Sequence, residues 1–137
     1  MGGAVNELFA QFLIRIYCEI PSSVIAEFST LKILLSPNFR DFRNIFRAKL
    51  GRIFLIPADT FDNVNGKFPI GFHIWHTSIK ELFTSTLAHV YNKNGLFSCE
   101  KGLYTPNKGA LLMDWLKTLH DKYSERIAYL RMLGSDI

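Results

Sequence analysis

The chain contains 137 residues, of which 48% are hydrophobic and 20% are charged. This length and composition exclude a disordered chain and predict one compact domain with a buried core. Its 16 Lys and Arg outnumber its 12 Asp and Glu, which permits contact with a polyanion but does not demonstrate it.

The cysteine pattern and the N-terminus bear on the cellular compartment. Cys18 and Cys99 are far apart and neither belongs to a CxxC motif, so the sequence predicts neither a zinc site nor a disulfide framework. Met1-Gly2-Gly3 lacks the basic start of a signal peptide, and no apolar run approaches the roughly 18 residues of a membrane span. We therefore expect a reducing, cytoplasmic location.

Apolar spacing predicts the elements of the first part of the chain. A stripe at three- and four-residue intervals predicts a helix from about Val5 to Cys18, and SVIAEF, from Ser23 to Phe28, predicts a strand. The state of LKILL after this strand cannot be decided from periodicity. A second helix is predicted to begin after its N-cap, Ser36, and to close at Gly51. Its core face contains Phe39, Phe42, Phe46 and Leu50.

The second predicted helix also carries the densest basic feature of the chain. Arg40, Arg43 and Arg47 stand at positions i, i+3 and i+7, which would place three guanidinium groups on one flank. Such a flank could grip the phosphates of a nucleic acid. The alternative is an ordinary solvated helix face, partly neutralised by Asp41.

The centre of the chain, from Gly51 to Ser78, predicts a buried hairpin. Its sequence, GRIFLIPADTFDNVNGKFPIGFHIWHTS, contains two dense apolar runs of the kind found in strands buried on both faces. The polar loop between the runs carries an Asn-Gly turn signal, with Phe61 and Phe68 at its flanks. Aromatic rings on such a loop could be presented to a ligand.

A second hairpin and further helices are predicted towards the C-terminus. Residues from Thr86 to Tyr91 and from Leu96 to Cys99 would pair across the turn NKNG. A helix from Gly109 to Tyr123 would follow, and then a short final helix capped by Ser124. The apolar side of the longer helix contains Leu112, Trp115, Leu116, Leu119 and Tyr123.

The remaining polar residues form no clear catalytic or metal-binding group. His73 and His76 are three apart on a strand, so their side chains should point to opposite faces and not share a metal. His89 and His120 are isolated in the sequence. Asp59 and Asp62 flank Phe61, but Asp residues in loops usually serve their own turns.

Several segments resemble the C-terminal half of N6-adenine DNA methyltransferases of the restriction-modification type. These segments are ELFAQFLIRI, NFRDFRNIF, GRIFLIPADTF, GKFPIGFHIWHTS and VYNKNGLF. The resemblance implies an α/β fold, or α+β if the fragment rearranges. It implies a partial class I methyltransferase sheet over residues 1–78, in which the antiparallel last strand lies between the two before it. Residues 79–137 would add a hairpin and helices to the same domain.

The resemblance also implies roles for residues in the central loop. In the family, an aromatic residue after the sixth strand stacks on the adenine that is flipped out of DNA. The matching residue here is Phe61, with Phe68 second, and Lys67 could neutralise a nearby phosphate. Simple core filling is the alternative for both rings, and an ordinary exposed surface residue is the alternative for Lys67.

Two motifs that define these enzymes are absent from the sequence. The chain contains neither the glycine-rich loop for S-adenosylmethionine nor the Asn/Asp-Pro-Pro-Tyr/Phe tetrapeptide that holds the target amino group. No cofactor-binding or catalytic residue can therefore be assigned, and the chain is predicted to be inactive alone.

Three functions remain open from the sequence. The chain is predicted to be a fragment of an adenine methyltransferase that supplies the adenine-stacking loop and a DNA-facing wall. The alternatives are a stand-alone nucleic-acid-binding module and a protein-interaction module. The resemblance further predicts that the strand from Ser23 to Phe28 lies at a sheet edge and that a homo-oligomer covers it, unless the chain's own N-terminal helix or second hairpin does so.

Overall fold

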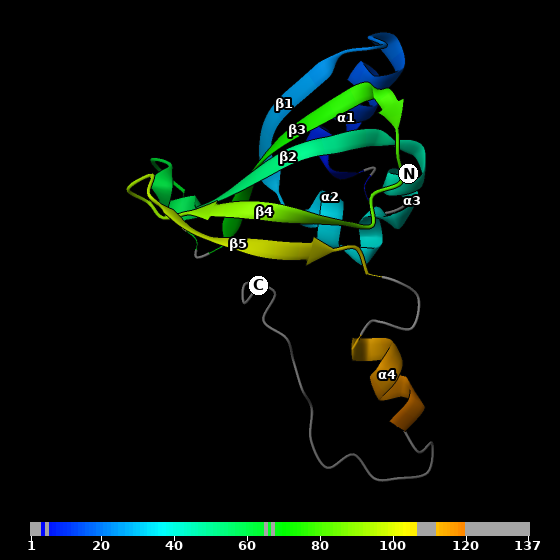
Figure 1. Ribbon diagram of the computed structural model, residues 1–137. Coiled ribbons are helices and arrows are strands. Elements are labelled where there is room, and N and C mark those ends of the chain that lie inside the picture. The colour runs from blue at the N-terminus through cyan, green and yellow to red at the C-terminus, as the bar shows by residue number, and fades with distance from the viewer. Residues whose placement is uncertain (1–3, 5, 65, 67, 107–111, 120–137) are drawn as a thin grey trace.

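The predicted α/β class is confirmed by a five-stranded mixed sheet with short helices (Figure 1). The computed structural model describes residues 4, 6–64, 66, 68–106 and 112–119. The helices are α1 (Leu8–Glu19), α2 (Lys32–Leu35), α3 (Arg40–Ile45) and α4 (Leu112–Leu119), with 3-10 turns η2 (Pro37–Phe39) and η3 (Ala58–Thr60). The strands are β1 (Val24–Thr30), β2 (Ala48–Pro57), β3 (Pro69–Lys80), β4 (Ser85–Tyr91) and β5 (Phe97–Tyr104).

The strand order is β1-β3-β2-β4-β5, and β3 is antiparallel to both of its neighbours. The central hairpin is therefore confirmed, as is the insertion of a reversed strand between the two strands that precede it. The second predicted hairpin is also present, because β4 and β5 pair across the turn at residues 92–96. It joins the same sheet through parallel pairing of β4 with β2.

The helix expected to run to Gly51 ends six residues earlier, at Ile45 in the observed α3. Its last backbone bond runs from the Phe46 N–H to the Phe42 carbonyl, and strand β2 begins at Ala48. Leu50 lies opposite Trp75 in the sheet. Residues from Ala48 onward therefore pair with β3 in place of the last turn of the predicted helix, although Leu50 fits the apolar spacing of a helix.

Among the described residues, helices cover only one face of the sheet, so the prediction of hairpin strands buried on both faces is wrong. On β3, residues from Gly71 to Thr77 alternate between buried and half-buried. The buried side packs against α1, α2 and α3, and includes Ile53 and Trp75. The opposite side carries apolar rings that stay partly exposed, such as Phe28 at 55%.

Arg43 is part of the core, which overturns the predicted stripe of three arginines. Its side chain is 6% exposed, and Nη1 donates to the carbonyls of Ile33 at 2.7 Å and Ser36 at 3.0 Å. These carbonyls lie at the C-terminal end of α2, where a positive charge is favourable. Burial lowers the pKa of Arg43. Arg40 is exposed, and Arg47 is exposed beyond the end of α3, so the three do not share a flank.

Strand β1 lies at one edge of the sheet, as predicted, because it pairs with β3 alone. Val24 is 62% exposed on this strand. The β4–β5 hairpin lies at the opposite side of the sheet and does not cover the β1 edge (Figure 1). Among the described residues, no helix is long and apolar enough to cross a membrane.

Replacing Arg43 with Ala should lower the free energy of unfolding by about 1.5–3 kcal/mol, because two buried carbonyls lose a charged donor. Arg40→Ala is the matched control and should change it by less than about 0.5 kcal/mol, since Arg40 is exposed. Urea titration measures both values. Equal stability of the two variants would contradict the structural role of Arg43.

The open β1 edge is predicted to pair with a second copy of the chain. Light scattering at micromolar concentration should then report a homodimer or larger oligomer. Ala26→Lys places a charge on this exposed strand and should give the monomer mass, whereas Ser98→Lys on the other edge strand, β5, should not. A wild-type monomer, or equal effects of the two substitutions, would rule out assembly through β1.

Candidate functional site

A cavity of about 850 Å³ lies where strands β2 and β4 part. The two strands pair only at Phe54–His89 and Leu55–Val90, although β2 continues to Pro57. Helix α2 and strand β5 complete the walls. The cavity is lined by Leu31, Leu35, Leu55, Ile56, Pro57, Asp59, Phe68, Pro69, Val90, Tyr91, Asn92, Lys93, Lys101, Gly102, Leu103 and Tyr104.

The lining combines an apolar interior with a few polar groups. The lining includes leucines from α2, β2 and β5 together with the aromatic residues Phe68, Tyr91 and Tyr104. Lys93 and Lys101 provide two cations, and among the described residues neither makes an ion pair. The volume falls within the usual range for small-molecule sites. Such a lining suits a flat apolar ring that carries an anionic group.

The loop between β2 and β3 brings Phe68 to this cavity. The Ala58 N–H donates to the Phe68 carbonyl at 2.9 Å, which closes the base of the loop. A Cβ atom at Gly66 would collide with the Phe68 ring. The ring therefore lies directly against the backbone at Gly66, and any larger residue there would displace it.

The structure separates the two aromatic residues that the sequence singled out. Phe68 lines the cavity, whereas Phe61 packs edge-on against Phe28 of β1, with ring centroids 5.4 Å apart. Phe61 therefore contributes to the sheet face that the helices leave uncovered. Their roles in adenine stacking stay predictions, but only Phe68 lies at the cavity. Lys67 lies outside the described residues.

The presence of two lysines in the cavity lining could not be predicted from the sequence. The turn signal NKNG located the β4–β5 hairpin, and the Asn92 side chain does cap that turn by accepting from the N–H groups of Asn94 and Leu96. However, the approach of Lys93 and Lys101 to Phe68 depends on the pairing of β4 with β2. Local sequence contains no signal for that long-range pairing. Neither Arg40 nor Arg47 lines the cavity.

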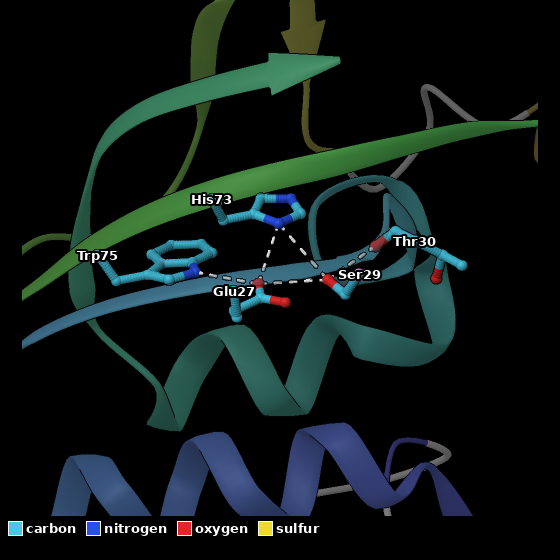
Figure 2. A network of polar contacts seen from close by, with 5 residues as sticks. All are labelled: Glu27, Ser29, Thr30, His73 and Trp75. Carbon is cyan, nitrogen blue, oxygen red and sulfur yellow. Dashed lines mark hydrogen bonds and ion pairs between the residues drawn. The ribbon is translucent and has the colours of Figure 1, made fainter. Parts of the chain in front are cut away.

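A second polar cluster lies under the covered face of the sheet. The His73 Nδ1 atom lies 2.9 Å from Glu27 Oε1, to which Ser29 Oγ donates at 3.2 Å. Trp75 Nε1 approaches the same oxygen at 3.5 Å. Figure 2 shows these side chains directed at one another from the neighbouring strands β1 and β3. The predicted divergence of the two histidines is confirmed, because His73 is buried and His76 is on the other face.

This cluster joins two strands, and its imidazole is closed to solvent. His73 is 0% exposed, and its Nε2 atom has no hydrogen-bond partner among the described residues. Ser29 and Glu27 both approach the same nitrogen, Nδ1, so the imidazole cannot relay a proton between them as in a Ser-His-Asp triad. The arrangement therefore stabilises the β1–β3 pair.

Neither the described side chains nor the comparisons with known proteins identify a catalytic centre. Within the described residues, no group of three His, Cys, Asp or Glu side chains could hold a metal ion. No family model, curated protein or solved structure matches the chain. The cavity beside Phe68, with its apolar lining and two lysines, is the candidate functional site.

Proposed function

We propose that the chain forms the base-binding wall of an adenine-specific DNA methyltransferase of the restriction-modification type and transfers no methyl group by itself. The observation that carries this proposal is the position of Phe68. It lies at the end of the loop between β2 and the reversed strand β3, and it lines a cavity together with Lys93 and Lys101.

The cavity supplies the contacts that an unpaired adenine nucleotide requires. A base taken out of a duplex needs a ring or apolar side chains to replace its lost stacking. Phe68 offers a flat ring, and the lining includes leucines of α2 and β2. Lys93 and Lys101 offer two positive charges to a phosphate. In this arrangement the stacking position belongs to Phe68 and not to Phe61.

S-adenosylmethionine does not fit the groups at this cavity. Its sulfonium is a cation, whereas the charged groups of the lining are two lysines and a single carboxylate, Asp59. The sequence also lacks the glycine-rich loop of the family. We therefore derive no chemical step through this cofactor, and methyl transfer would require groups outside the described residues.

A protein-interaction module is the second candidate, because one face of the sheet is apolar and uncovered by α1, α2 and α3. The hypothesis of a stand-alone nucleic-acid-binding module is weakened, because Arg43 is buried and cannot reach a phosphate.

Phe68→Ala should weaken binding of a labelled adenine-containing single-stranded oligonucleotide about tenfold at low salt, because stacking on one ring contributes about 1–3 kcal/mol. Phe61→Ala is the matched control, since that ring packs on Phe28 instead. Fluorescence anisotropy measures both affinities. Loss of affinity in the Phe61 variant alone would contradict the cavity as the adenine site and would support Phe61 as the stacking residue.

The isolated chain is also expected to transfer no methyl group from S-adenosylmethionine to adenine in DNA, because the cavity does not fit this cofactor. A tritiated-methyl assay with purified protein tests this expectation. Incorporation above that of a heat-denatured control would show that the chain contains a cofactor site and would refute this part of the proposal.

A further inference from the structure

A continuous band of aromatic rings crosses the uncovered face of the sheet. From β1 to β5, successive ring centroids are separated by 4.6 Å (Phe28–Phe72), 6.3 Å (Phe72–Phe54), 6.0 Å (Phe54–Tyr91) and 5.9 Å (Tyr91–Phe97). We call this surface the aromatic face. It consists of Phe28, Phe54, Phe72, Leu87, Tyr91 and Phe97.

The aromatic face is exposed to an extent that calls for a covering element. Phe28 is 55% exposed, Leu87 64% and Phe97 57%, and they lie on three different strands. Helices α1, α2 and α3 pack on the opposite side of the sheet. Because contiguous apolar surface of this size costs free energy in water, it usually marks a contact with another helix, protein or membrane.

The charges on this face point to an apolar occupant and not to a nucleic acid. Lys49 pairs with Glu81 at 3.4 Å, and His89 lies 3.3 Å from Glu100. Lys49, a cation of this face, is therefore already matched by a carboxylate. Arg52, even with the imidazoles of His76 and His89 beside it, would offer little of the positive potential on which nucleic-acid affinity depends.

Within the described part of the chain, helix α4 has an apolar side whose large side chains Trp115 and Leu119 remain exposed. Leu112, Trp115, Leu116 and Leu119 recur at three- and four-residue spacing. Trp115 is 55% exposed and Leu119 is 62% exposed, and Figure 1 shows α4 apart from the sheet. The described part of the helix has 8 residues, and isolated helices below about 12 residues are marginal in water. Helix α4 therefore needs a packing partner to be stable.

We infer that α4 docks across the aromatic face of its own chain, with Trp115 and Leu119 against the rings. Strand β5 ends at Tyr104, and residues 105–111 can span up to about 24 Å when extended. The middle of the face, at Phe54 on β2, lies two strands across, or about 10 Å, and about 13 Å back along β5, because Phe54 pairs with His89 and His89 pairs with Glu100. The separation from Tyr104 is therefore about 16 Å, which is within this reach. The tether also gives α4 a millimolar effective concentration, which favours it over the same helix of a second copy.

Acrylamide quenching of Trp115 tests this inference in the full-length chain. The second tryptophan, Trp75, is 2% exposed, so subtracting the signal of a Trp115→Phe variant isolates Trp115. Docking predicts that Trp115 is protected in the wild type and that its quenching constant rises several-fold in the double variant Phe28→Ser, Leu87→Ser. Leu8→Ser with Leu96→Ser replaces two leucines of similar exposure elsewhere, at 65% and 63%, and should leave Trp115 protected.

Leu119→Ser provides an independent check, because it weakens the apolar side of α4 without altering the sheet and should also release Trp115. Docking within one chain requires protection to persist when dilution leaves only monomer, as verified by light scattering. Protection that disappears on dilution would assign the face to a second copy. A Trp115 as accessible in the wild type as in the double variant would overturn docking altogether.

Discussion

The pairing of β3 with strands on both of its sides is the constraint on which the rest of the structure depends. Strand β3 lies between β1 and β2 and is antiparallel to both, so the alternation of its side chains, common to all strands, separates a covered from an uncovered face across the middle of the sheet. Trp75 and His73 point towards the helices, and Phe72 points away. This alternation gives the sheet one face that packs against the helices and one face that carries aromatic rings.

The same pairing explains why the two loop aromatics have different surroundings. Phe61 lies after the end of β2 and packs against Phe28 on the uncovered face. Phe68 lies directly before β3 and lines the cavity. The Ala58–Phe68 backbone bond holds the two ends of the loop together. A ligand bound beside Phe68 and a helix bound on the aromatic face would therefore contact the loop at separate places.

Local patterns in the sequence predicted the elements whose causes are local. Pro21 and Ser36 marked real boundaries, and the apolar runs around Phe54 and Phe72 were strands. The reversed strand followed from the resemblance to adenine methyltransferases and not from periodicity. Leu50 was misassigned because one leucine can continue a helical spacing and also face the core from a strand.

The parts that could not be predicted depend on contacts between distant residues. The burial of Arg43 requires the carbonyls at the end of α2, which periodicity did not reveal as a helix. The cavity requires β4 to lie beside β2, because only this pairing brings Lys93 and Lys101 near Phe68. A chain with the same local patterns and another strand order would have no such site.

Titration of the isotopically labelled chain with deoxyadenosine monophosphate, followed by amide chemical shifts in NMR, tests most directly whether the cavity beside Phe68 binds an adenine nucleotide. If it does, the largest shifts occur at Phe68, Lys93 and Lys101, which line the cavity. Shifts confined to Phe28 and Phe61 on the uncovered face, or no saturable shifts, would contradict it.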